Sequence, residues 1–239
     1  MPDNGRANPQ ANPASPAVRS PFSLPQLAIL AFVFALLVVL VQIGALRIAF
    51  EKLGLAPESA ALLFVLSLAG SLFNLPLFTI DADAPAGPRP LPRPFRLLNL
   101  EPVPFTGKTL IAVNVGGGAV PVAFSLYLVT HNPVSLWQVL LAVAAVTAIC
   151  RAISRPVPGL GIGMPVLVAP VAAALVALIL SADQAPTLAY VGGTLGVLIG
   201  ADLLRFGDIR AMGAPVASIG GAGTFDGIFI TGLVAVLLA

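Results

Sequence analysis

The stretch TLAYVGGTLGVLIGADLL, residues 187–204, decides the fold class. Its residues are apolar or weakly polar, apart from a single charge at Asp202 near the end. About 20 residues of this kind cross the hydrocarbon core of a bilayer as a helix, so the stretch predicts a transmembrane helix. The whole chain agrees, with 58% hydrophobic residues, 9% charged residues and a mean hydropathy of +0.99. Soluble domains carry about 25% charged residues, so we expect a membrane protein.

Six further apolar runs lie along the chain, at residues 25–50, 59–78, 109–130, 135–153, 165–181 and 216–239. We therefore expect an all-α bundle of about seven transmembrane helices, forming one domain over residues 25–239. Residues 1–24 are rich in Pro, Asn, Ala and Ser and predict a disordered tail. Lys and Arg gather in the tail and after the second, fourth and sixth runs, which predicts a cytoplasmic N-terminus. The expected location is the inner membrane of the cell, crossed several times and surrounded by lipid.

Two of the runs are interrupted. The second contains Asn74 and Pro76, and the third contains Asn114 and the glycines 116–118. Such breaks free backbone groups that must be satisfied inside the protein or in a wet cavity. Between these runs, the Pro-rich segment 79–108 is expected on the cytoplasmic side. It is either a linker or a short extended element that pairs with a peptide substrate by strand addition.

Composition and spacing exclude several classes of function. The chain has one Cys and one His, which leaves no intrachain disulfide and no cysteine pair for redox or zinc chemistry. Its twelve Lys and Arg residues are scattered among loops, so membrane topology explains them better than nucleic-acid binding. The sequence has no metal-ligand cluster and no phosphate-cradling loop, and we expect neither a metal nor another cofactor.

Asp202 and Asp226 are the acidic residues that lie within apolar runs. A charge inside a bilayer costs at least about 2.5 kcal/mol, so such acids usually face the bundle interior and serve a function. The predicted topology places both near the cytoplasmic side, and the surrounding glycines allow close helix approach. If the carboxylates meet, repulsion prevents both from being ionised, and the pair shares a proton. One carboxylate can then activate water while the other protonates or polarises a peptide carbonyl, as the two acids of aspartic proteases do.

Other interpretations of the same residues stay open. Asp226 could cap its helix, and Asp202 could pair with Arg205 at the membrane boundary. Asn114, the broken third run and the two acids could instead form a cation or proton site of a transporter. The glycines could also be packing surfaces of a scaffold without chemistry.

Three segments carry a family resemblance: SRPVPGLGIGMP (154–165), GTLGVLIGADLLR (193–205) and GAPVASIGGAGTFDGIFITGLVAVLLA (213–239). They resemble domain-of-unknown-function family 1614, whose name carries no activity. A second resemblance is to the GxGD intramembrane aspartyl proteases, the presenilin and signal-peptide-peptidase group. It implies catalytic roles for Asp202 and Asp226, and it makes Gly221 and Gly223 the glycines of the motif. The implied substrate is a transmembrane or leader peptide, and we count Gly221, Gly223 and Asn114 as candidate substrate-binding or gate residues.

Overall fold

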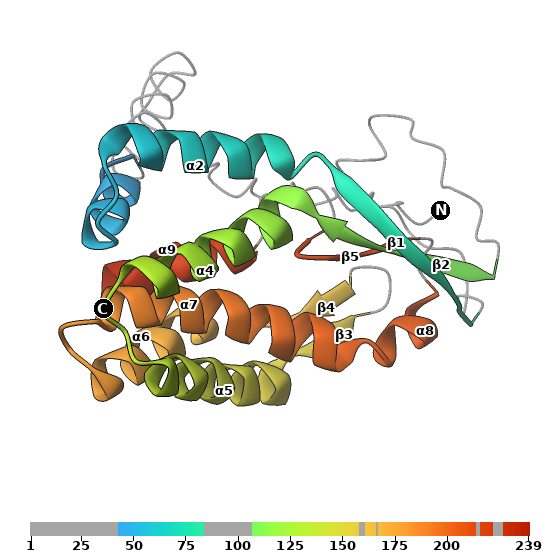
Figure 1. Ribbon diagram of the computed structural model, residues 1–239. Helices are drawn as coiled ribbons and strands as arrows, with labels where there is room; N and C mark the ends of the chain where they lie inside the picture. Colours follow the sequence, from blue (N-terminus) through green and yellow to red (C-terminus); the bar gives the residue numbers. More distant parts are fainter. Residues whose placement is uncertain (1–42, 84–106, 158–160, 166, 214–215, 222–226) are drawn as a thin grey trace, which may run out of the picture. The chain divides into compact units, whose positions relative to one another are not determined.

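The structure is a computed structural model that describes residues 43–83, 107–157, 161–165, 167–213, 216–221 and 227–239. Helices form most of this described part of the chain. Residues 44–239 form one compact unit. The α-helices are Ile43–Lys52, α2 (Pro57–Gly70), α4 (Val120–His131), α5 (Leu136–Ile153), α6 (Val168–Leu180), α7 (Ala185–Val197), α8 (Asp208–Met212) and α9 (Gly227–Leu238). Two π-helical segments, η1 (Val115–Ala119) and η2 (Leu198–Asp202), and one 3-10 turn, η3 (Leu203–Arg205), adjoin them. Figure 1 shows their order along the chain.

Among the described residues, two continuous helices are long and apolar enough to cross a membrane, Leu136–Ile153 and Ala185–Arg205. They confirm the helices predicted over residues 135–153 and 187–204. The helices Ile43–Lys52 and Pro57–Gly70 meet at 115° and would together make a third, broken span. Residues 115–131 and 168–180 form shorter apolar helices. The chain is thus a mostly helical membrane protein.

The expectation of an all-α chain is wrong, because three apolar runs contain strands. Their ranges are β1 (Asn74–Asp81) in the second run, β2 (Lys108–Asn114) in the third and β5 (Val216–Ile219) in the seventh. Each strand contains or adjoins residues that interrupt helical geometry. These are Asn74 and Pro76 within β1, Asn114 at the end of β2 with the glycines that follow it, and Gly220 directly after β5. Apolar stretches of about four to eight residues, the length of these strands, do not by themselves distinguish a strand from a buried helix, and here each one continues into a longer apolar run that predicts a helix.

The three strands form one sheet in the order β1-β2-β5 (Figure 1). β1 pairs antiparallel with β2, from Asn74 opposite Asn114 to Asp81 opposite Lys108, with an irregularity between Pro76 and Phe78. β2 pairs parallel with β5, from Leu110 opposite Val216 to Val113 opposite Ile219. The ends of the Pro-rich segment 79–108 therefore belong to paired strands, whereas residues 84–106 lie outside the described residues. A second, two-stranded sheet joins β3 (Arg155–Val157) and β4 (Gly161–Gly163).

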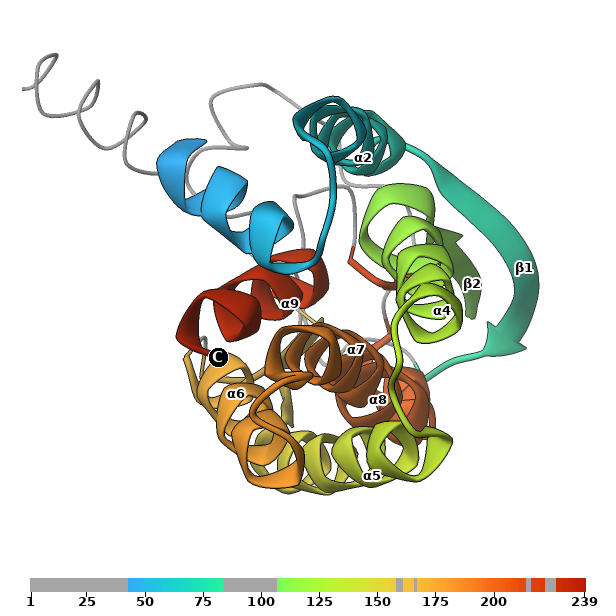
Figure 2. The same ribbon diagram turned by 60° about the vertical axis from the view of Figure 1, so that its left-hand side comes forward.

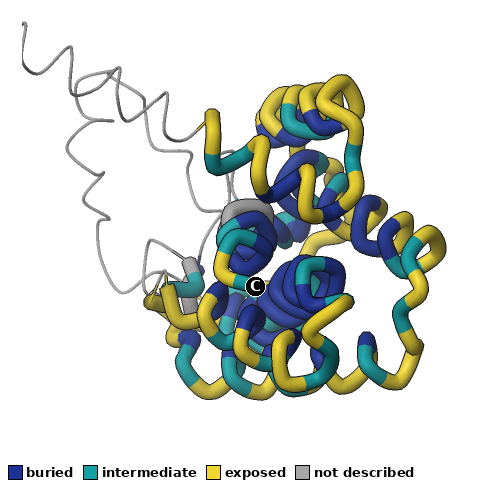
Figure 3. Tube along the Cα trace, turned by 90° about the vertical axis from the view of Figure 1, so that its left-hand side faces the viewer, coloured by how far each residue is buried: buried dark blue, intermediate teal, exposed yellow. Residues whose placement is uncertain are grey.

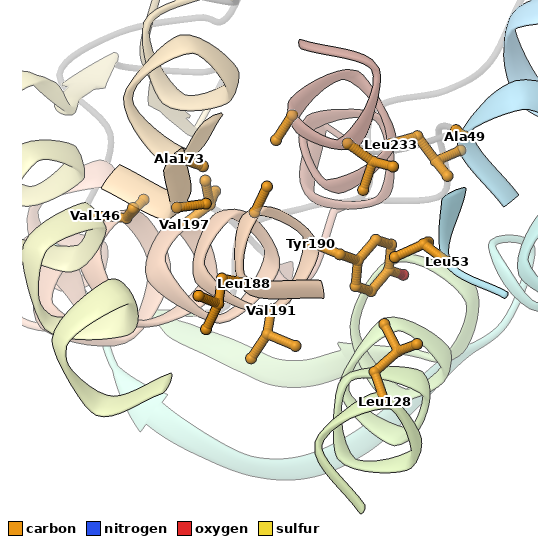
Figure 4. Close-up of a cluster of buried hydrophobic side chains, with 14 of the residues drawn as sticks. Ala49, Leu53, Leu128, Val146, Ala173, Leu188, Tyr190, Val191, Val197 and Leu233 are labelled. Atoms are coloured by element: carbon orange, nitrogen blue, oxygen red, sulfur yellow. The ribbon is translucent and has the colours of Figure 1, made fainter. Parts of the chain in front are cut away.

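The core is centred on α7, which packs against α4, α5, α6 and α9 (Figure 2). Tyr190, Leu188 and Val191 of this helix are fully buried, and Leu128 and Leu53 lie around the Tyr190 ring (Figure 4). By contrast, α2, α5 and α6 carry many exposed leucine and valine side chains. Exposed residues are yellow in Figure 3. In a membrane protein these outer side chains face lipid, which is as apolar as they are.

Glycines set the distance between α7 and α5. A Cβ added to Gly196 would lie 2.6 Å from the Val146 side chain, and one on Gly200 would lie 2.5 Å from the Thr147 carbonyl oxygen. One turn earlier, a Cβ on Gly192 would lie 3.2 Å from that of Ala142. The repeat of small residues every four positions is the known solution for close helix contact in membranes. It holds the helix that carries Asp202 tightly against α5.

Candidate functional site

Asp202 lies near the end of the long helical stretch that α7 begins. It is the last residue of the π-helix η2, in which the wider hydrogen-bonding pattern shifts the side-chain register relative to an α-helix, and the 3-10 turn η3 follows it. The Asp202 side chain is partly buried, and its Oδ2 accepts a hydrogen bond of 2.9 Å from the backbone N–H of Gly220. A carboxylate that accepts a backbone N–H makes a charge-assisted bond, which is among the stronger hydrogen bonds in proteins.

Gly220 occupies a position that only glycine fits. Its φ is +81°, and a Cβ at this position would lie 2.6 Å from the backbone of Gly118. The turn after β5 is thereby seated between η1 on one side and Asp202 on the other. Two segments far apart in the sequence, the VGGGA break and the end of α7, converge on one backbone amide. The structure thus brings together η1, the turn after β5 and the end of the helical stretch that carries Asp202, and we call this meeting point the junction.

Asn114 organises the η1 side of this junction. Its side chain is fully buried, and its Oδ1 accepts a hydrogen bond of 2.8 Å from the N–H of Gly117, which caps the π-helix. Its Nδ2 donates to the carbonyl oxygen of Ser71 at 2.7 Å and to Oδ1 of Asn74 at 3.1 Å. The amide of Asn114 therefore satisfies the backbone groups that the break leaves open, as expected inside a membrane.

Asn74 and Ser218 extend the polar contacts across the sheet. Ser218 Oγ of β5 donates to Asn74 Oδ1 of β1, at 2.5 Å, and Asn114 Nδ2 of β2 donates to the same oxygen. All three residues lie at the end of the sheet that leads to Gly220. We call Asn74, Asn114 and Ser218 the amide cluster. The sequence marked Asn74 as a break in an apolar run, but its partnership with Ser218 became visible only through the strand pairing.

Arg205 contributes to the end of α5 rather than to the acid. Its guanidinium donates to Ser154 Oγ at 3.1 Å, to the Arg151 carbonyl oxygen at 3.0 Å and to the Ser154 carbonyl oxygen. It also forms an ion pair of 3.1 Å with Asp208. A cation on the last carbonyls of a helix stabilises the negative end of its dipole. The contacts of Arg205 therefore favour a helix-capping role over the pairing with Asp202 that the sequence left open.

The predicted site residues divide into two groups. Asp202, Asn114 and Gly221 are described: Asp202 lies at the junction, Asn114 supports it, and Gly221 follows Gly220 with φ +98°. Asp226 and Gly223 lie outside the described residues, so the structure neither joins nor separates the two acids. Sequence reasoning did not single out Gly220 as a contact of Asp202, although its place in a glycine-rich turn was a signal.

A family model described as "Protein of unknown function (DUF1614)" matches residues 68–238. The chain belongs to this family. The DUF1614 match includes the whole junction, from the amide cluster to Asp202 and Gly220, and it also includes Asp226. Comparison with curated proteins and with solved structures returned no match.

Proposed function

We propose that this DUF1614 protein is an intramembrane aspartyl protease, in which Asp202 and Asp226 form a shared-proton pair that hydrolyses a membrane-embedded peptide. The observation that supports the proposal is the hydrogen bond from Gly220 N–H to Asp202 Oδ2. It ties the first acid to the glycine-rich turn that leads, within the same apolar run, to the second acid. The other acids among the described residues lie outside the apolar runs, whereas Asp202 lies inside one.

The packing of α7 against α9 gives independent support. Thr194 of α7 faces Gly232 of α9, because a Cβ on Gly232 would lie 2.6 Å from Thr194 Oγ1. A helix rises about 1.5 Å per residue, so Asp202 lies about 12 Å along α7 from this contact. Gly227, the residue after Asp226, lies about 8 Å from it along α9. Figure 1 shows α9 ending at the labelled C-terminus, beside the start of α7, so the two helices run antiparallel, and both positions fall toward the same end of the pair.

The proposed chemistry divides the work between two carboxyl groups. Asp202, stabilised as a carboxylate by the Gly220 N–H, takes a proton from a water molecule as the water oxygen attacks the peptide carbonyl carbon. Asp226, in its protonated form, gives its proton to the carbonyl oxygen, and the product of this step is a neutral gem-diol. Collapse of the diol breaks the C–N bond as the proton on Asp202 passes to the leaving nitrogen and one hydroxyl proton of the diol returns to the Asp226 carboxylate, which leaves a carboxylic acid and an amine and restores both acids. Repulsion between two close acids in a low dielectric keeps one of them protonated for this purpose.

A peptide must be extended before its bond can be attacked, and β1 offers a template for that. β1 is the outer strand of its sheet, and its residues are exposed along nearly its full length. Exposed strand edges bind extended peptides through main-chain hydrogen bonds. Strand addition, which the sequence suggested for segment 79–108, is therefore proposed for β1, next to the amide cluster.

The proposed setting is the inner membrane of the cell, crossed about seven times with the N-terminus in the cytoplasm. The support is the distribution of Lys and Arg described above, together with the two long helices and the shorter apolar ones. In this topology the Asp202 end of α7 faces the cytoplasm, from which water reaches the acids.

The transporter and scaffold alternatives gain less from the structure. The Asn114 amide was the candidate ligand of a transported cation. Its oxygen accepts a hydrogen bond from Gly117, and its nitrogen donates to Ser71 and Asn74. The glycines of α7 do pack as a scaffold would require, but such packing also serves an enzyme. We therefore place the protease first.

The test is replacement of each acid by its amide. Asp202→Asn and Asp226→Asn should each reduce hydrolysis of a fluorogenic single-span peptide in proteoliposomes by at least about a thousandfold, since neither amide replaces its acid in proton transfer. Asp183→Asn, an exposed change in the loop before α7, is the matched control and should hydrolyse the peptide at the original rate. Full hydrolysis by either dyad variant, folded as judged by size exclusion, would rule out the proposed pair.

A further inference from the structure

The orientation of the Asn74 amide follows from a chain of contacts that begins at the backbone. Gly117 N–H is only a donor, so the atom it meets on Asn114 must be the oxygen. The other end of that amide is then the nitrogen, which agrees with its contact to the Ser71 carbonyl oxygen. Because this nitrogen also contacts Asn74, the atom it meets there is Oδ1. Ser218 Oγ donates to the same Oδ1.

Two donors on one oxygen turn the other end of the amide outward. The Asn74 Nδ2 group therefore carries its two N–H donors away from Asn114 and Ser218, on a residue that is exposed. Its neighbours in sequence, Phe73 and Leu75, are exposed apolar residues. An outward pair of donors on such an apolar surface costs free energy unless an acceptor reaches it. Within the described residues no hydrogen bond of Asn74 Nδ2 is formed, which leaves water or a ligand oxygen to supply that acceptor.

The position of Asn74 connects it to the acid. Ser218 lies two residues before Gly220, and one strand residue rises about 3.3 Å, so roughly 7 Å of β5 separates the Ser218 backbone from the amide that binds Asp202. Asn74 also begins β1, the outer strand of the sheet. Through β2, the Asn74 end of β1 lies at the same end of the sheet as the end of β5 that leads to Gly220, so a peptide along β1 lies beside Asn74 at the end of the sheet nearest Asp202. Its carbonyl oxygens are acceptors of the kind that an amide N–H₂ binds.

We infer that Asn74 is a substrate-binding residue, whose outward Nδ2 donates a hydrogen bond to one backbone carbonyl oxygen of an extended peptide and so sets the register of the peptide against Asp202. The inference rests on the proposed protease function. It adds to that function a stated ligand group, the carbonyl oxygen of an extended apolar segment. It also gives the amide cluster a purpose beyond satisfying the break at η1, since Asn114 and Ser218 hold the donor in place.

The experiment measures binding rather than turnover. The probe is a fluorescein-labelled apolar heptapeptide with a central hydroxyethylene group, which imitates the tetrahedral intermediate, and binding to the detergent-solubilised full chain is followed by anisotropy. Asn74→Ala should weaken binding roughly five- to tenfold, the size of one lost hydrogen bond. Asn74→Asp keeps the oxygen that Asn114 and Ser218 need but presents a second oxygen to the probe, so it should weaken binding further while the protein remains folded.

A double-mutant cycle locates the partner group. Probes in which one peptide carbonyl at a time is reduced to a methylene are compared on the original protein and on Asn74→Ala. At one position the loss on the original protein should disappear on the variant, because the two changes remove the same bond. Asn132→Ala, at the end of α4, is the matched control and should bind the probe as the original protein does.

The outcomes separate the two proposals. If Asp202→Asn weakens probe binding but both Asn74 variants bind normally, the inference about Asn74 is wrong and the protease proposal stands. If Asn74→Ala weakens binding equally for all reduced probes, the residue has no carbonyl partner and the inference is also wrong. Normal probe binding by Asp202→Asn would instead count against the protease proposal itself.

Discussion

At the scale of single residues, the junction depends on a backbone amide rather than on a side chain. Gly220 presents its N–H to Asp202 only because its φ is positive and because no Cβ stands between it and Gly118. Both conditions are properties of glycine. Sequence alone predicted that Asp202 matters and that glycines surround it. The Asp202–Gly220 contact could not be predicted, because it depends on strand pairing between distant segments.

Replacement of Gly220 by alanine tests this dependence. Gly220→Ala should lower the free energy of unfolding by about 1–2 kcal/mol for the left-handed backbone, and by a further 1–3 kcal/mol for the clash with Gly118. Gly54→Ala is the matched control, because Gly54 has φ +75° but no atom within 4 Å of its added Cβ. It should cost only the backbone part. If denaturant unfolding shows that both variants lose the same free energy of unfolding, the contact between position 220 and the Gly118 backbone is not a close one.

At the scale of elements, helices with ordinary geometry were predictable and interrupted ones were not. α5 begins at a capping box of Ser135 and Gln138 and runs without a break, and the sequence predicted it within a residue or two. The runs that contain β1, β2 and β5 look equally apolar, but Asn74, Asn114 and Gly220 divert them into strands. Their hydrogen-bond partners lie on other runs, so local pattern carries no record of the pairing.

The contact between α7 and α5 allows a prediction at this scale. Gly196→Ala places a methyl group 2.6 Å from Val146 and should destabilise the protein by about 1–3 kcal/mol, although alanine is the better helix former. Val146→Ala removes the Cγ1 that lies 2.6 Å from the added methyl group but keeps the Cβ at the same distance, so combining it with Gly196→Ala should recover only part of the loss. The measurement is unfolding in mixed micelles for both single variants and the double one. A strictly additive double variant would contradict direct contact between these positions.

At the scale of the whole molecule, the three strands explain how one chain satisfies the polar groups at the places where its apolar runs are interrupted. The sheet, η1 and the end of α7 satisfy one another's backbone groups around Asn114 and Gly220. This arrangement obeys the requirement that irregular backbone in a membrane be buried in protein or line water. It also gathers the diverted ends of three apolar runs beside Asp202, which neither a uniform bundle nor a single span would do.

Membrane orientation is the remaining property that belongs to the whole chain, and its one cysteine makes it measurable. Cys150 is fully buried, so a membrane-impermeant maleimide should leave the original protein unlabelled in intact cells and in open membranes. Asp183→Cys, in the loop before α7, should be labelled in intact cells, because that loop lacks positive charge and is expected outside. Arg210→Cys, on α8, should be labelled only after the membrane is opened. The reverse labelling pattern would mean the opposite membrane orientation, with the Asp202 end of α7 outside the cytoplasm. Labelling of both variants in intact cells would mean that an even number of crossings separates the two positions.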